Sequence, residues 1–307
     1  MRPPPIRGPV LAEPQPSAWD RVQLARHAER PYSLDYIQRL APDFEELKGD
    51  RMTGDDPALV AGVGTWNGRT TMFFGQQKGR GLSDRVARGW GMMHPQGYRK
   101  AVRLARQAAK FGFPIISLID TPGAFPGTSA EEDGIASAIA MAIREWFHTR
   151  TPVLAVVVGE GGSGGALGMA VADRVLMMEN SVYSVASPEA AASILWRDIS
   201  YKAEAAEQLH LTSDDLLELD IVDEVILEPP GGAHADHDAA ARQLHEALLR
   251  NLEIVSAHEH HHLLEKRRHR FMKIGHLTDH HALPKRVAVA VPTTPDAGSP
   301  AEAPDLV

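Results

Sequence analysis

The chain has 307 residues, a hydrophobic content of 43% and a formal net charge of −8 at pH 7. This length can bury a full core, as one large domain or one and a half. The absence of cysteine excludes disulfides and thiolate metal sites and fits a cytoplasmic location. The negative charge argues against nonspecific nucleic-acid binding. The sequence has neither a signal-peptide core nor an apolar run of about eighteen residues, so export and membrane spanning are not indicated.

The first part of the chain combines a proline-rich leader with short helices. Residues 1–16 contain six prolines and are expected to be disordered. Ser17 and Asp20 form a capping box before a helix predicted to end near Pro31, and Ser33 starts a second short helix.

A hairpin signal follows, and then a basic stretch. Two β-prone runs, 58–66 and 70–74, flank Asn67-Gly68, which favours a tight hairpin turn. Residues 76–93 are polar, glycine-rich and basic, which predicts a long functional loop.

Pro95 opens a helix predicted to reach about Phe111, closed by Gly112. Four basic residues lie at helical spacing along it: Arg99, Arg103, Arg106 and Lys110. This basic face is either solvated or a landing surface for an anionic partner or a CoA phosphate.

The middle of the chain alternates strands and helices. The predicted order is a strand at 115–119, a turn at 120–124, a helix at 132–149 and a strand at 153–158. Such alternation predicts an α/β fold with a largely parallel sheet and right-handed crossovers. The two glycine-bearing loops after these strands leave the sheet at its carboxyl edge, where ligands bind in such folds.

The last third is predicted to be mostly helical. The expected strands are 174–178, 182–185 and 221–227, and the expected helices are 188–196, 201–209, 213–219 and a long charged one at 236–272. Residues 284–307 are rich in proline, alanine and acid and are expected to be disordered.

The loop after the strand at 153–158 carries six glycines within ten residues, from Gly159 to Gly168. Three functional patterns fit it. It matches the dinucleotide GxGxxG with Glu179 as the ribose acid, the GxSxG nucleophile elbow centred on Ser163, and an oxyanion hole made of backbone amides. A tight turn needed only for packing is the structural alternative.

Local spacing weakens the first two patterns. Only about eight residues separate the glycines from the next strand, fewer than a dinucleotide crossover helix needs. No histidine stands in a recognisable signature for a Ser163 base, and the surrounding glycines suggest a floppy rather than a strained elbow. An HExxH match at 258–262, the pattern of a zinc metalloprotease, lies in a histidine-rich tract, where such a match occurs easily by chance.

Taken together, the motifs resemble the α subunit of the bacterial acetyl-CoA carboxylase carboxyltransferase. The matching stretches, in family order over about residues 18–273, are QLARHAERPYSLDYIQRL, GDR, QKGR, HPQGYRKAVRLA, IDTPGAFPG, GEGGSGGAL, YSVASPEAAASILW and EPPGGAH. The resemblance implies a crotonase-type spiral of ββα units spanning residues 17–273, with helical segments at both ends.

The resemblance also implies an activity and its partners. Such subunits help transfer a carboxyl group from carboxybiotin, held on a biotin carboxyl carrier protein, to acetyl-CoA, giving malonyl-CoA for fatty-acid synthesis. Biotin carboxylase is a further component. A related β subunit with a Cys₄ zinc ribbon binds acetyl-CoA and completes the site, and the expected assembly is α₂β₂. No metal is expected in this chain, which should be inactive alone.

Site residues follow from the same resemblance. Backbone amides of Gly164 and Gly165 are expected to hold the biotin ureido oxygen. The backbone amides of Gly123 and Ala124, on the neighbouring loop, are expected to form the second side of this oxyanion hole. Gly161 and Gly162 belong to the biotin side. A bulky residue at Gly165 is expected to abolish transfer while leaving the protein soluble. The alternatives are another crotonase-type acyl-CoA enzyme, such as a hydratase, and a non-catalytic scaffold.

Overall fold

The structure, a computed structural model, describes residues 16–257 and 260–275. The predicted disordered tail and, except for Pro16, the predicted leader lie outside these residues. So do His258 and Glu259 of the HExxH match. No described helix has the length and apolar character needed to cross a membrane.

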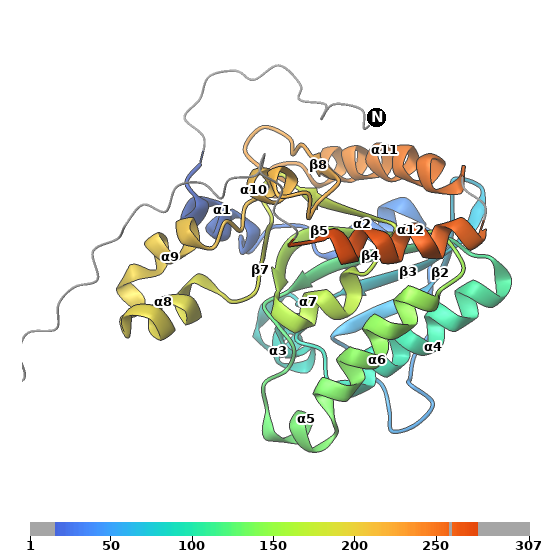
Figure 1. The fold of residues 1–307 in the computed structure, drawn as a ribbon, viewed down its shortest axis with the longest axis horizontal. Coiled ribbons are helices and arrows are strands. Elements are labelled where there is room, and N and C mark those ends of the chain that lie inside the picture. Colours follow the sequence, from blue (N-terminus) through green and yellow to red (C-terminus); the bar gives the residue numbers. More distant parts are fainter. Residues whose placement is uncertain (1–15, 258–259, 276–307) are drawn as a thin grey trace, which may run out of the picture. The chain divides into compact units, whose positions relative to one another are not determined.

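The described chain forms one eight-stranded sheet in the order β1-β2-β3-β4-β5-β6-β8, with β7 paired to β5 (Figure 1). The strands are β1 (Glu45–Glu46), β2 (Leu59–Trp66), β3 (Arg69–Gln76), β4 (Ile115–Thr121), β5 (Val153–Gly162), β6 (Arg174–Met178), β7 (Val182–Ser184) and β8 (Glu224–Ile226). From β3 to β8 all pairings are parallel, which confirms the predicted α/β fold with a largely parallel sheet.

The predicted hairpin is confirmed. Strands β2 and β3 pair antiparallel up to Trp66 and Arg69, so Asn67 and Gly68 alone make the turn. Both have positive φ, 48° and 71°, as a type I′ turn requires.

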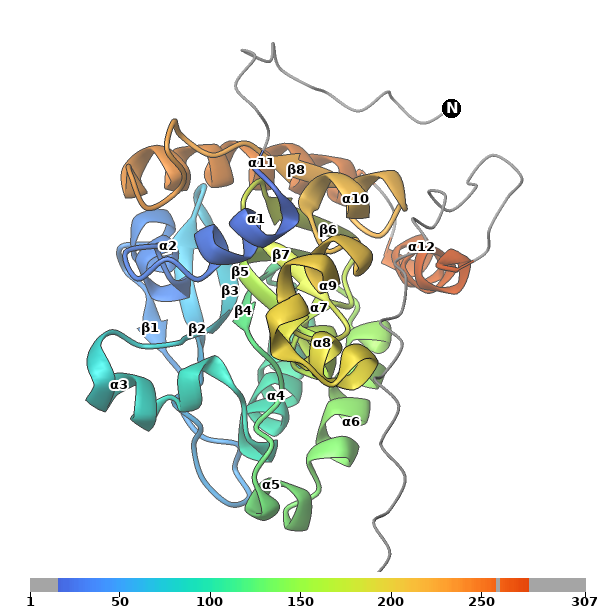
Figure 2. The same cartoon turned by 90° about the vertical axis from the view of Figure 1, so that its left-hand side faces the viewer.

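Helices cover both faces of the sheet (Figures 1 and 2). The helices of the described residues are α1 (Ala18–Ala25), α2 (Ser33–Leu40), α3 (Gly81–Ala87), α4 (Pro95–Phe111), α5 (Thr128–Glu132), α6 (Ile135–His148), α7 (Ser163–Ala170), α8 (Pro188–Trp196), α9 (Lys202–Gln208), α10 (Ser213–Glu218), α11 (His237–Ser256) and α12 (His260–Lys273), with 3₁₀ turns at Gly89–Gly91 (η1) and Ile199–Tyr201 (η2).

Strand β5 shows how the two cores arise. Val153, Ala155 and Val157 point into the core beneath α4, α6 and α7. The alternate residues Leu154, Val156 and Val158 point into the core beneath α2 and α11. Because both faces are covered, the strand is a continuous apolar run rather than an alternating one.

Several predicted boundaries are wrong. The long helix at 236–272 is two helices, because α11 packs on one face of the sheet while Arg267 of α12 bonds to the end of α6. The loop at 76–93 contains α3 and η1. The helix expected from residue 132 starts at Ile135, after Gly134 with φ 80°, and a separate α5 precedes it.

Other elements differ in length from the prediction. Helix α1 ends at Ala25, well before Pro31, because the chain makes two turns after it. Strand β5 continues to Gly162, since its last residues pair with β7. Strand β8 covers only part of the predicted 221–227. Helices α4 and α8 match their predicted bounds.

Candidate active site

Two glycine-bearing loops meet at the carboxyl edge of the sheet, after β4 and after β5. A β-carbon on Gly162 would lie 2.1 Å from the Pro122 carbonyl oxygen, and one on Gly165 would lie 2.3 Å from the Gly123 carbonyl carbon. Real β-carbons do not approach backbone so closely, so only glycine lets these loops touch. The predicted convergence of the two loops is confirmed.

Helix α7 starts at this contact and directs backbone N–H groups away from the strand. Within the described part of the chain, the N–H groups of Gly164 and Gly165 have no hydrogen-bond acceptor. A β-carbon on Gly164 would meet only Ile139 Cδ1, at 3.6 Å, and one on Gly123 would meet nothing within 4 Å. Unpaired amides at a helix N-terminus, next to open space, can bind an anion.

The other predicted glycines have different roles. The N–H of Gly123 donates to Thr121 Oγ1 at 3.2 Å, within its own turn. The neighbouring Ala124 N–H has no acceptor among the described residues. A β-carbon on Gly161 would lie 2.8 Å from Tyr183 Cδ2, so Gly161 is needed for packing.

The structure changes the interpretation of two positions. Even a methyl group on Gly165 would strike the backbone of Gly123 and Ala124, so a bulky residue there would disturb the fold as well as the amide. Ser163 has φ 47°, so the elbow is strained rather than floppy. Its exposed side chain has no hydrogen-bond partner in the described residues, and therefore no histidine base.

An ionic cluster, buried at Lys78, Asp120 and Glu160 and reaching the surface at Arg26, was missed by the sequence analysis and lies beside the glycine loops. We call it the Lys78 cluster, and its members are Arg26, Lys78, Asp120, Glu160 and Glu189. Lys78 Nζ lies 2.8 Å from Asp120 Oδ1 and 2.6 Å from Glu160 Oε2. Arg26 joins Glu160 to Glu189 through contacts of 2.6 Å each. The available signal was an acid near the end of each of two adjacent strands, with one lysine in the preceding loop.

Burial and the neighbouring charges shift the pKa values of the three buried members. Burial acts to raise the pKa of Glu160, but Lys78 and Arg26 outweigh it and lower that pKa to about 2. Burial acts to lower the pKa of Lys78, but Asp120 and Glu160 raise it above its ordinary value. Burial raises the pKa of Asp120 despite the opposing charge of Lys78, and its Oδ2 is buried without a partner in the described residues.

A second buried ion pair supports the end of β5. Arg30 Nε donates to the carbonyl of Val158 at 2.8 Å, and its guanidinium pairs with Glu228 at 2.5 Å. Both side chains are fully buried. Glu228 also accepts the N–H of Ala233 at 2.7 Å, which folds the EPPGGA segment back onto the carboxylate.

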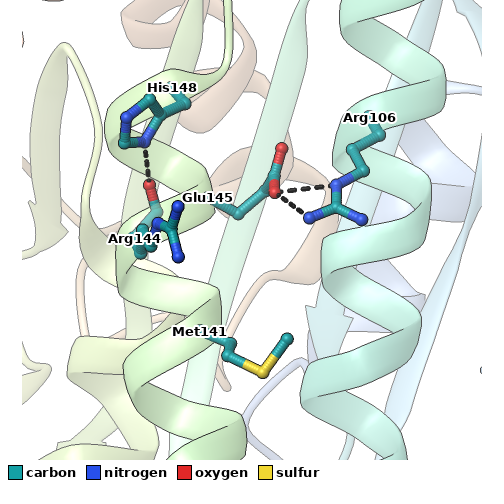
Figure 3. A pocket seen from close by; sticks show the side chains of 5 residues that line it. All are labelled: Arg106, Met141, Arg144, Glu145 and His148. Carbon is teal, nitrogen blue, oxygen red and sulfur yellow. Dashed lines mark hydrogen bonds and ion pairs between the residues drawn. The ribbon is translucent and has the colours of Figure 1, made fainter.

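The basic face of α4 is engaged within the chain. Arg99 Nε donates to Asp50 at 3.0 Å, Arg103 Nε donates to the carbonyl of Gly49 at 3.0 Å, and Arg106 pairs with Glu145 at 2.7 Å. These contacts favour a structural role over a landing surface for CoA. Arg106 and Glu145 line a small surface pocket between α4 and α6 (Figure 3), which contains no residue of the glycine loops.

The geometry also disfavours a dinucleotide site. Glu179 Oε2 accepts the N–H of Glu228 at 3.0 Å, so it is tied into the fold instead of facing the glycines. Helix α7 has only eight residues, too few for a dinucleotide crossover. Among the described residues, no group of three or more His, Cys, Asp or Glu side chains is arranged to hold a metal ion.

A family model described as acetyl co-enzyme A carboxylase carboxyltransferase-like matches residues 14–275. The chain belongs to this family. The acetyl-coenzyme A carboxylase carboxyl transferase subunit alpha of Geobacter metallireducens is 50% identical over 263 residues, covering 86% of this chain and 83% of the relative. The corresponding subunit of Deinococcus radiodurans is 52% identical over 259 residues, covering 84% of this chain and 82% of the relative. The resemblance found in the sequence is confirmed, and the chain is an acetyl-CoA carboxylase carboxyltransferase component.

Solved structures of other carboxyltransferases and decarboxylases share the fold of this α-subunit family member. Transcarboxylase 12S with methylmalonyl-coenzyme A bound matches with a TM-score of 0.59 at 21% identity, covering 74% of this chain and 44% of that one. A Pseudomonas malonate decarboxylase hetero-tetramer in complex with coenzyme A matches with a TM-score of 0.62 at 18% identity, covering 76% of this chain and 91% of that one. The predicted crotonase-type fold is thereby confirmed.

Proposed function

We propose that this chain supplies the biotin-side half of the carboxyltransferase site. The N–H groups of Gly164 and Gly165 would hold the ureido oxygen of biotin on its carrier protein. The observation that carries this proposal is the pair of unpaired amides at the start of α7, next to open space. Biotin, when bound, carries the carboxyl group that acetyl-CoA receives.

The residues fit such a group. Negative charge that develops on an oxygen is stabilised by amides fixed in advance and by the positive end of the helix dipole. Ala124, whose N–H has no acceptor in the described residues, is the better candidate for the second side of the oxyanion hole, because the Gly123 N–H already donates to Thr121. Gly161 and Gly162 shape the backbone that positions these donors.

An exposed apolar surface supports the need for a partner subunit. We call it the α8 patch; its members, with exposed fractions of 57–76%, are Val185, Ile194, Leu195 and Ile199. Helix α8 lies away from the sheet, beside α9 (Figure 1). We assign this patch to the β subunit, which would bring acetyl-CoA and a zinc ribbon in an α₂β₂ assembly. The carrier protein, biotin carboxylase and the cytoplasmic location belong to the same proposal.

The alternatives find less support. A hydratase needs a side-chain acid or base free to exchange a proton. The acids beside the glycine loops, Asp120 and Glu160, are buried and paired with Lys78. A scaffold has no need for two unpaired amides beside two loops that only glycine allows to touch.

Decarboxylation of malonyl-CoA in the presence of biotin tests the proposed function. We expect activity when this chain is mixed with a zinc-ribbon β subunit, because each chain supplies half of the site. Either chain alone, and the mixture without biotin, are the controls and should be inactive. Activity of this chain alone on an acyl-CoA, without biotin, would replace the proposal with the hydratase class.

A further inference from the structure

The regular pairing of β4 with β5 breaks where the glycine loops begin. Ile119 pairs with Val157, but the next pair along is Thr121 with Gly161, so β5 has two more residues than β4 in this interval. A parallel ladder fixes two strands through evenly spaced backbone hydrogen bonds. At this irregularity, other contacts must fix the strand ends relative to each other.

The Lys78 cluster provides those contacts. Lys78 is buried after the end of β3, and its Nζ bridges Asp120 near the end of β4 and Glu160 near the end of β5. Asp120 Oδ1 also accepts the N–H of Glu160 at 2.9 Å. A β-carbon on Gly159 would lie 2.4 Å from the same oxygen, so glycine is required for this approach.

Each bridged acid directly precedes one of the loops that form the candidate site. Asp120 leads into Pro122 and Gly123, and Glu160 leads into Gly162 and α7. Because these loops touch with no room for a β-carbon, a shift of one strand end would move the α7 amides. We propose that Lys78 is a positioning residue, which locks the ends of β4 and β5 so that the amides at Gly164 and Gly165 keep their geometry. This inference rests on the proposed function.

Lys78→Met tests this role, with Lys100→Met as the matched control. Lys100 is also buried, and its Nζ contacts Asp55 at 2.6 Å and the carbonyls of Asp56 and Leu59, none of them in the glycine loops. Both variants should unfold more easily. Only Lys78→Met should lower kcat for biotin-dependent malonyl-CoA decarboxylation with the β subunit, by about tenfold with KM for malonyl-CoA unchanged.

A second readout does not depend on activity. Hydrogen exchange at residues 167–170, which lie in α7 beyond the unpaired amides, should be faster in Lys78→Met than in wild type, and unchanged in Lys100→Met. If Lys78→Met does not fold, the double variant Lys78→Met/Asp120→Asn removes two opposite charges together and should fold, while still showing lower kcat and faster exchange.

Two outcomes would overturn the inference. One is equal exchange at residues 167–170 in wild type and in the Lys78 variant. The other is an equal loss of kcat in both lysine variants, which would make Lys78 merely structural. The wild-type activity reports separately on the proposed function: if the wild-type chain with its β subunit shows no biotin dependence, that function fails, and the exchange comparison still decides the role of Lys78.

Discussion

Proline at Gly164 should lower kcat for biotin-dependent carboxyl transfer by about 10²- to 10³-fold, the usual cost of losing one oxyanion donor. Proline removes the N–H that we assign to the ureido oxygen. The helix itself should tolerate proline, because first-turn N–H groups make no intrahelical bond. Gly164 is a better position than Gly165, since a β-carbon there meets only Ile139 Cδ1, at 3.6 Å. Initial rates with the β subunit measure the effect.

The control variant must keep the N–H of residue 164, and its backbone strain at residue 163 must match that of the proline variant. Ser163 has φ 47°, and a following proline restricts the backbone further, so both variants are made in a Ser163→Gly background. Ser163→Gly/Gly164→Ala retains the N–H and should keep most of the activity. Equal kcat for the alanine and proline versions would remove the amide from the mechanism. Inactivity of Ser163→Gly alone would restore Ser163 as a nucleophile.

Replacing Arg30 by methionine should lower the free energy of unfolding by about 3–5 kcal/mol, the usual cost of breaking a buried ion pair. The substitution leaves Glu228 charged and fully buried, and it also removes the donor to the Val158 carbonyl. Urea unfolding measures the loss. Arg39→Met is the matched control, because Arg39 pairs with an exposed Asp238 and its loss should change stability little. Equal free energies of unfolding for the two variants would contradict the stabilising role assigned to the Arg30–Glu228 pair.

Elements with strong local signals were predictable from the sequence. Helix α4 begins at Pro95 and ends before Gly112, which adopts φ 72°, and these are the residues that start and stop helices by their own geometry. The hairpin turn at Asn67-Gly68 is equally local. The division between α11 and α12 has no such local signal, because it depends on a tertiary contact: Arg267 of α12 donates to carbonyls at the end of α6.

The candidate site was predictable in part. The glycines of both loops stand out in the sequence, and the family resemblance suggested their role. The Lys78 cluster was not predicted. The acids near the two strand ends were visible in the sequence, but only the sheet order brings Lys78, Asp120 and Glu160 together from segments far apart in the chain. The state of individual amides, such as the Gly123 N–H that already donates to Thr121, also depends on the folded loop.

The most direct test of the central claim follows the carboxyl group itself. Malonyl-CoA labelled at its free carboxyl carbon is incubated with this chain, a β subunit and the biotinylated carrier protein, and the label on the carrier is counted. The expected result is labelled carrier together with acetyl-CoA, only when both chains are present and the carrier is biotinylated. Acetyl-CoA formation with this chain and no biotinylated carrier, or no label on the carrier with both chains present, would contradict the account.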